Sequence, residues 1–151
     1  MKSCNAIVIG SGRGGVPLAT NLGDRGWVTL IEKGEVGGSC INYGCTPTKT
    51  MISSARIAHY ERVAPEFGVH PDMIKVDIAA VVARKNEIVE SFRSGVQDQI
   101  DGGPNVRLYR GQGRFTGPHV VEVDGEALIG DKIFINTVRG HVFLPFLVSI
   151  K

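Results

Sequence analysis

The stretch Asn5–Glu32, NAIVIGSGRGGVPLATNLGDRGWVTLIE, decides the fold of this chain of 151 residues. It opens with the apolar run Asn5–Ile9, which is typical of a strand buried on both faces of a parallel sheet. A helical pattern over Val16–Leu22 and a second apolar strand over Trp27–Ile31 follow. Pro17 fits this helix because its missing N–H is not needed in a first turn. The stretch therefore predicts a strand–helix–strand unit with parallel strands.

The turn between the first strand and the helix carries a G-x-G-x-x-G pattern formed by Gly10, Gly12 and Gly15. In such a turn the glycines allow a tight bend, a close approach to a pyrophosphate, and close packing of helix on strand. The N-terminus of the helix adds N–H groups and a positive dipole end. Glu32 ends the second strand about 20 residues later, where a carboxylate accepts hydrogen bonds from a ribose. The pattern predicts a dinucleotide site but does not separate FAD from NAD.

Two cysteines, Cys40 and Cys45, lie five residues apart in Gly37–Lys49, GGSCINYGCTPTK. On a straight helix this spacing corresponds to a rise of about 7.5 Å, which exceeds the roughly 7 Å that a disulfide can bridge between Cα atoms. A disulfide therefore requires a bent or unwound turn, and Gly44 is the residue that permits it. Zinc is the weaker interpretation, because zinc sites use two ligand clusters and Cys4 is the one remaining cysteine.

Composition limits the classes of protein to which the chain can belong. Hydrophobic residues make up 42%, charged residues 21%, and the mean hydropathy is +0.05, which is typical of a globular domain. The net charge of +2 argues neither for nor against a nucleic-acid partner. The basic residues are scattered and form no block, and we expect no such partner. No run reaches the roughly 20 apolar residues of a membrane span. Three cysteines without a targeting segment predict a cytoplasmic protein, where a close cysteine pair is more often redox-active than structural.

The rest of the chain predicts a helical excursion and then a small antiparallel element. Helical patterns cover Thr50–Val63 and, after Asp77 as N-cap, residues 78–100, and we expect the second helix to pack on the sheet. The strands that we expect after it are Val106–Tyr109, a hairpin of His119–Val123 with Ala127–Ile129 across Asp124-Gly125, and a buried parallel strand, Lys132–Thr137.

The segments VIGSGRGG and LIEKGEVGGSCINYGCTPTKTM closely resemble the FAD-binding start of the pyridine nucleotide–disulfide oxidoreductases, a family that includes dihydrolipoamide dehydrogenase, glutathione reductase and mercuric reductase. The cysteine segment is most similar to the mercuric reductase branch. The resemblance covers about Asn5 to Thr137. It implies an α/β fold, namely a Rossmann-like FAD-binding domain with a parallel sheet, a helical excursion and a small antiparallel β element. Residues 1–151 would then be an incomplete FAD-binding domain, without the family's NAD(P)H-binding and C-terminal dimerisation domains.

The resemblance also implies roles for individual residues. Cys45 would be the charge-transfer thiolate beside the flavin, and Cys40 the interchange thiol that meets the substrate. Lys49 would lie near the flavin N5 edge, and the alternative for it is a solvated lysine on a helix face. The residues that would bind the cofactor FAD are Gly10, Gly12, Gly14, Gly15, Glu32, Lys33, Gly38, Ser39, Gly113 and Thr137. We expect no resident metal.

In the family, electrons pass from NAD(P)H through FAD to the cysteine pair and on to a small-molecule disulfide or a metal-ion substrate. The resemblance implies an FAD-dependent oxidoreductase fragment with little turnover alone. NAD(P)H and a homodimer are expected only for a full-length form. One alternative is a non-catalytic FAD- or dinucleotide-binding module or truncated-gene product, and another is a metal-handling protein with the two thiolates as soft ligands. The sequence departs from the family at Arg13, where relatives often carry a small residue or proline, and over residues 138–151.

Overall fold

The computed structural model describes residues 2–72 and 75–137, which form a six-stranded sheet in the order β3-β2-β1-β6-β5-β4 and a set of helices. The strands are β1 (Lys2–Ile9), β2 (Val28–Glu32), β3 (Val106–Arg110), β4 (Arg114–Gly117), β5 (Val120–Val123) and β6 (Glu126–Ile135). The helices are α1 (Gly15–Gly23), α2 (Gly38–Asn42), α3 (Cys45–Val63), the short 3-10 helix η1 (Ala64–Phe67) and α4 (Ile78–Asp101). The divergent segment 138–151 lies outside the described residues.

The sheet has a parallel part and an antiparallel part, as the sequence predicts. β3, β2, β1 and β6 pair in parallel, whereas β5 and β4 continue the sheet antiparallel from β6. The predicted α/β class with a helical excursion and a small antiparallel element is therefore confirmed. The prediction of two separate strands over residues 127–129 and 132–137 is wrong, because one strand, β6, runs through both segments to Ile135. β6 is continuous, and a Cβ at Gly130 would lie 2.8 Å from Ile7 Cγ1, so glycine here permits close contact with β1.

The two faces of the sheet are both buried, which explains the unbroken apolar run in β1. On one face Leu30 packs with Ala19 of α1 and with Ile100 near the end of α4. On the opposite face Ile7 packs with Val121 of β5 and with neighbouring residues of β6. The carboxyl ends of the parallel strands are left at one edge, where α2 and the glycine turn meet.

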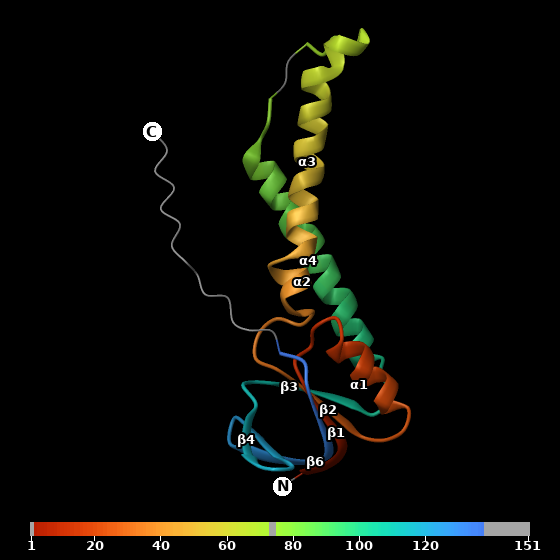
Figure 1. Cartoon of the computed structure of the whole chain (residues 1–151), viewed down its shortest axis with the longest axis vertical. Coiled ribbons are helices and arrows are strands. Elements are labelled where there is room, and N and C mark those ends of the chain that lie inside the picture. The colour runs from red at the N-terminus through yellow and green to blue at the C-terminus, as the bar shows by residue number, and fades with distance from the viewer. Residues whose placement is uncertain (1, 73–74, 138–151) are drawn as a thin grey trace.

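Helices α3 and α4 run side by side and project from the sheet as an arm (Figure 1). Arg84 of α4 donates to the Thr50 carbonyl of α3 at 3.2 Å, which ties the two helices together. In α4 only Val89 and Ile100 are fully buried. The expectation that α4 packs along the sheet is therefore wrong for most of its length, since only its last turns reach the sheet. An amphipathic pattern gives the face that is buried but not its partner.

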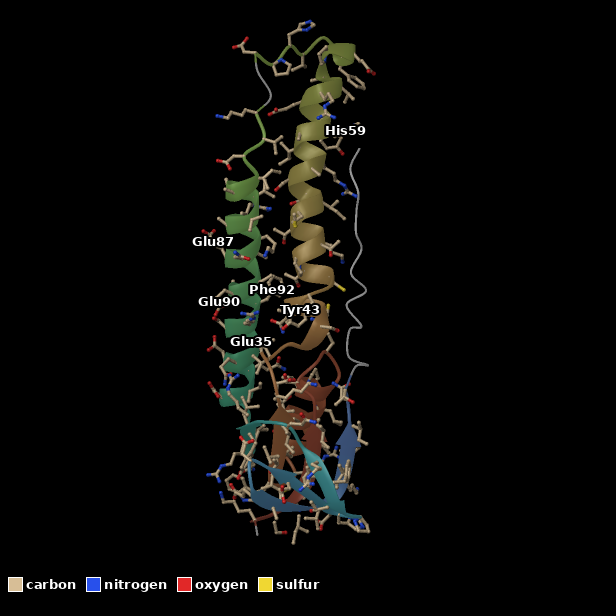
Figure 2. All side chains as sticks on the ribbon, turned by 90° about the vertical axis from the view of Figure 1, so that its left-hand side faces the viewer. Glu35, Tyr43, His59, Glu87, Glu90 and Phe92 are labelled. Carbon is tan, nitrogen blue, oxygen red and sulfur yellow. The ribbon has the colours of Figure 1, made fainter. Side chains whose placement is uncertain are left out.

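Several local signals in the sequence have the expected structure. Asp77 caps α4, and its Oδ1 accepts a hydrogen bond from the backbone N–H of Ala80 at 3.0 Å. Asp124 and Gly125 both have positive φ and close the β5–β6 hairpin. His59 lies on the exposed outer part of α3, away from Tyr43 at the base of the arm (Figure 2). Among the described residues, no helix is long and apolar enough to cross a membrane.

Close packing at the start of α1 depends on Gly15. A Cβ at this position would lie 1.9 Å from the Gly10 carbonyl oxygen and 2.8 Å from Asn136 Nδ2. The Gly10 oxygen belongs to the backbone and cannot move away as the end of a side chain would. The third glycine of the pattern is thus required by the contact between helix and strand, as the sequence predicts.

We predict that Gly15→Ala lowers the free energy of unfolding by about 2 kcal/mol or more, because the new methyl group overlaps backbone. The matched control is Gly95→Ala in α4, where a Cβ would meet nothing within 4 Å. That control should be more stable by roughly 0.5–1 kcal/mol, since alanine favours a helix interior over glycine. Urea unfolding measures both, and a Gly15→Ala protein as stable as wild type would contradict the packing described.

Candidate functional site

A cleft of about 460 Å³ opens at the carboxyl ends of the parallel strands, beside the glycine turn. In open α/β sheets this edge is where ligands bind. Eight of the ten residues predicted to bind a cofactor line it, namely Gly10, Gly12, Glu32, Lys33, Gly38, Ser39, Gly113 and Thr137. The other two lie behind it at the start of α1, where Gly14 is the N-cap and Gly15 packs on Gly10. The sequence therefore located the cleft, while the binding roles of these residues stay predictions.

Glu32 is held at the cleft by the first turn. Its Oε2 accepts from the backbone N–H of Ser11 at 2.9 Å and from the Ser11 hydroxyl at 2.7 Å. Its Oε1 accepts from the N–H of Gly34 at 3.0 Å. Burial raises the pKa of Glu32, but the hydrogen bonds from Ser11, Gly34 and Lys33 outweigh it, so the pKa is lowered. The carboxylate is therefore ionised at neutral pH, as an acceptor for ribose hydroxyls must be.

Helix α2 begins in direct contact with the glycine turn. Gly37 donates its N–H to the Ser11 carbonyl at 3.1 Å. Gly38 has φ of 63°, and a Cβ there would lie 2.8 Å from Gly12 Cα. Glycine is thus required at Gly38 both by its left-handed backbone and by the approach of the two loops. This contact places the cysteine segment Gly37–Lys49 against the glycine turn.

The chain breaks between α2 and α3, between the two cysteines. α2 ends at Asn42 and α3 begins at Cys45, so the residues between them depart from helical geometry. At Gly44 a Cβ would lie 3.0 Å from the Ser39 carbonyl oxygen, which shows how tightly the chain turns back. The bend that a Cys40–Cys45 disulfide needs is therefore present. In the structure both residues are free thiols, half-buried at Cys40 and exposed at Cys45.

The two thiols are close enough to influence each other's ionisation. The pKa of Cys40 is raised, first by a hydrogen bond with the Cys45 side chain, and further by burial and by the Cys45 charge. The Arg13 cation and the backbone N–H of Cys45 act in the opposite direction and favour the Cys40 thiolate. Arg13 lies in the glycine turn, at a position where relatives often carry a small residue or proline. Here it brings a positive charge close to Cys40.

The remaining predicted residue, Lys49, lies one helical turn after Cys45 on an exposed part of α3. The structure brings it to the same end of the arm as the cysteine pair, and its role stays a prediction.

Residues that sequence reasoning missed also shape the cleft. Asn136 follows β6, donates its backbone N–H to the Ile9 carbonyl at 2.8 Å, and lies beside Gly12 and Gly14. Its position at a strand end facing the glycine turn was the signal that could have found it. Ser11 could have been found as the residue between two glycines that faces Glu32. Asn42 at the end of α2 has no comparable signal.

Comparisons with known proteins give relatives over most of the chain. The family described as pyridine nucleotide-disulphide oxidoreductase matches residues 4–141. Dihydrolipoyl dehydrogenase of Thermus scotoductus is 36% identical over 138 residues, which is 91% of this chain and 30% of that protein. Mercuric reductase of Bacillus cereus is 32% identical over 132 residues, 87% of this chain and 21% of that protein. This chain therefore spans less than a third of the length of these relatives.

Solved structures give the same result. The HOCl-induced flavoprotein disulfide reductase RclA from Escherichia coli has a TM-score of 0.75 and 34% sequence identity, covering 93% of this chain and 29% of that one. A Cu(II) complex of the same protein has a TM-score of 0.74.

We predict that Glu32→Gln lowers the free energy of unfolding at pH 7 by about 1–2 kcal/mol, because hydrogen bonds to a charged acceptor are lost. The folded-state pKa of Glu32 lies below its ordinary value of 4.5, so its stabilisation is present above that value. It is lost as the pH falls through the lower folded pKa. Urea unfolding between pH 7 and 3 should show the two proteins converging in acid. A difference that is independent of pH would argue against this role, and Glu61→Gln on the exposed face of α3 is the control.

We also predict opposite shifts in the pKa of Cys40 from two substitutions. Cys45→Ala should lower it, because the hydrogen bond and charge of Cys45 are removed, whereas Arg13→Ala should raise it, because a nearby cation is removed. The measurement is the pH dependence of iodoacetamide labelling in reduced protein, resolved to Cys40 by mass spectrometry. Equal labelling profiles in the three proteins would show that the thiols and Arg13 do not interact.

Proposed function

The chain belongs to the pyridine nucleotide-disulphide oxidoreductase family, and from this we propose that it is the FAD-binding domain of a flavoprotein disulfide reductase. The observation that carries the proposal is the contact between α2 and the glycine turn. It joins a dinucleotide-type cleft to a pair of thiols in one site. A dinucleotide-binding module alone has no need of a cysteine pair whose first member lies in a helix that lines its cleft.

The residues of the cleft fit the adenosine diphosphate half of FAD. The backbone of the turn Gly10–Gly15 and the N-terminus of α1, which no side chain caps, would hold the pyrophosphate. Glu32 is ionised and has the geometry to accept from the ribose. Gly113 and Gly38 line the cleft on either side. FAD, when bound, would supply the two-electron chemistry of its isoalloxazine ring, which the side chains of this chain lack.

The two cysteines divide the thiol chemistry between them. With the pair reduced, the Cys40 thiolate would attack one sulfur of a substrate disulfide and release the other sulfur as a thiol. The Cys45 thiolate would then attack Cys40 in the mixed disulfide, release the second substrate thiol, and form the Cys40–Cys45 disulfide. The pair loses two electrons and the substrate gains them. Because the pKa of Cys40 is raised, its attack needs a base to take the proton, and Arg13 assists by favouring the thiolate.

The identity of the substrate is a separate part of the proposal. A small disulfide suits thiol exchange, and a soft metal ion suits paired thiolates. The names of relatives include both a dihydrolipoyl dehydrogenase and a mercuric reductase. NAD(P)H as electron donor, and dimerisation, would belong to a longer form and stay predictions for this chain.

We predict that the reduced protein takes up FAD and that Gly12→Val abolishes uptake, because a side chain at Gly12 projects into the lining of the cleft. Glu32→Ala should weaken binding by about 10-fold to 100-fold, the equivalent of losing hydrogen bonds to a charged group. Flavin fluorescence during titration measures the dissociation constants. Gly95→Ala, far from the cleft on α4, should bind as wild type does. Failure of the wild-type protein to bind FAD would refute the proposal.

A further inference from the structure

The side chain of Asn42 holds the loop that leads into α2. Its Nδ2 donates to the carbonyls of Glu35 at 3.2 Å, Val36 at 3.0 Å and Gly38 at 2.9 Å. The first two carbonyls belong to the segment that connects Glu32 with α2, and the third belongs to the first residue of α2. One amide group therefore fixes the path of the backbone on the α2 side of the cleft.

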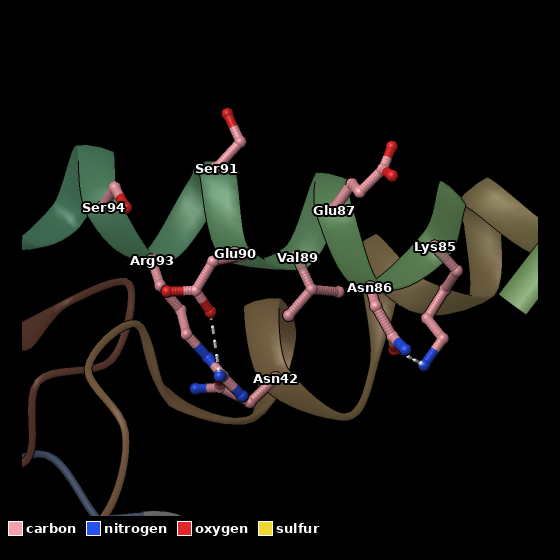
Figure 3. A pocket seen from close by; sticks show the side chains of 9 residues that line it. All are labelled: Asn42, Lys85, Asn86, Glu87, Val89, Glu90, Ser91, Arg93 and Ser94. Carbon is pink, nitrogen blue, oxygen red and sulfur yellow. Dashed lines mark hydrogen bonds and ion pairs between the residues drawn. The ribbon is translucent and has the colours of Figure 1, made fainter. Parts of the chain in front are cut away.

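Arg93 of α4 fixes the orientation of the Asn42 side-chain amide. Its Nε donates to Asn42 Oδ1 at 2.5 Å (Figure 3). If the amide were turned over, its NH₂ group would meet the N–H of Arg93, and its oxygen would meet three carbonyls. The hydrogen bond from Arg93 thus selects the orientation in which Asn42 donates to the loop.

The contact with Asn42 is more protected than the one with Glu90. Arg93 Nη1 also pairs with Glu90 Oε2 at 3.3 Å, and the side chains are 26% and 67% exposed respectively. An exposed pair of this kind contributes little to stability. A hollow of about 700 Å³ between α2 and α4 lies alongside this contact, and its open, mixed-charge lining offers no enclosed ligand site. Of the two side-chain contacts of Arg93, the hydrogen bond to Asn42 is therefore the one that we expect to hold α2 against α4.

The position of this bond links it to both parts of the site. Asn42 and Gly38 line the cleft, and Cys40 lies two residues before Asn42 in the same short helix. A shift of Asn42 would move the wall of the cleft and the thiol together. Arg93 itself lines no part of the cleft described above.

We propose that Arg93 is a positioning residue, which holds the Asn42 amide so that α2 keeps both the FAD cleft and Cys40 in place. This inference rests on the proposed function and adds to it a residue from the helical arm. It acts through Asn42 and not by contact with cofactor or substrate. The arm thereby becomes part of the redox site.

The test uses the full chain with Arg93→Met, Asn42→Ala and the double variant. Arg93→Met should weaken FAD binding about tenfold, as expected for one hydrogen bond to a charged donor. It should also lower the pKa of Cys40, because a loosened α2 weakens the Cys40–Cys45 hydrogen bond. The double variant should bind FAD as Asn42→Ala does, because Arg93 acts through Asn42.

The matched control is Arg84→Met on the same helix, since Arg84 binds only backbone and hydroxyl groups of α3. It should change thermal stability but neither FAD affinity nor the Cys40 labelling profile. Additive effects in the double variant, or an Arg93→Met protein with wild-type values, would overturn the inference. If Arg93→Met does not fold, Arg93→Lys takes its place with the same expectations, since lysine keeps the charge but has no Nε–H donor at this position.

The outcomes separate this inference from the proposed function. A wild-type protein that binds no FAD refutes the proposed function, and the Cys40 labelling profile of Arg93→Met then decides the inference alone. A wild-type protein that binds FAD, together with unaffected Arg93→Met and Asn42→Ala proteins, refutes the inference and leaves the proposed function standing.

Discussion

The contact between two backbones, at Gly38 and Gly12, is the constraint on which the site depends. It leaves no room for a Cβ at Gly38, and the hydrogen bond from Gly37 to Ser11 holds the loops in register. Ser11 also donates two hydrogen bonds to Glu32. The glycine turn, the end of β2 and the start of α2 therefore form one connected unit. Because these contacts use main chain and short side chains, they tolerate little rearrangement.

The helical arm contributes to this unit at its base. α3 brings Cys45 back toward Cys40 after the break at Gly44, and α4 reaches α2 through the Arg93–Asn42 hydrogen bond. The thiols differ in environment, since burial and the neighbouring sulfur raise the pKa of Cys40 while Cys45 is exposed. The sheet supplies the rigid edge of the cleft, and the two thiols come from α2 and from the first residue of α3.

Much of this could be predicted from the sequence, because the signals are local. The glycine turn, the Asp77 cap and the Asp124-Gly125 hairpin each depend on residues within a few positions of one another. Glu32 was found from its place at the end of the strand that follows the turn and its helix. Contacts between distant segments left no such signal. Periodicity showed that α4 has an apolar face but not that most of the helix runs beside α3 instead of the sheet. The break expected between residues 129 and 132 falls where close packing on Ile7 requires glycine at Gly130. The Asn42–Arg93 pair joins residues 51 positions apart, and neither residue follows a pattern.

Absorption spectroscopy of the FAD-loaded protein tests most directly whether the thiols and the flavin share one site. On reducing the cysteine pair while the flavin stays oxidised, we expect a new long-wavelength absorption band. The band should be absent in Cys45→Ser protein and retained in Cys40→Ser protein. A flavin spectrum that does not respond to the redox state of the cysteines would contradict the account.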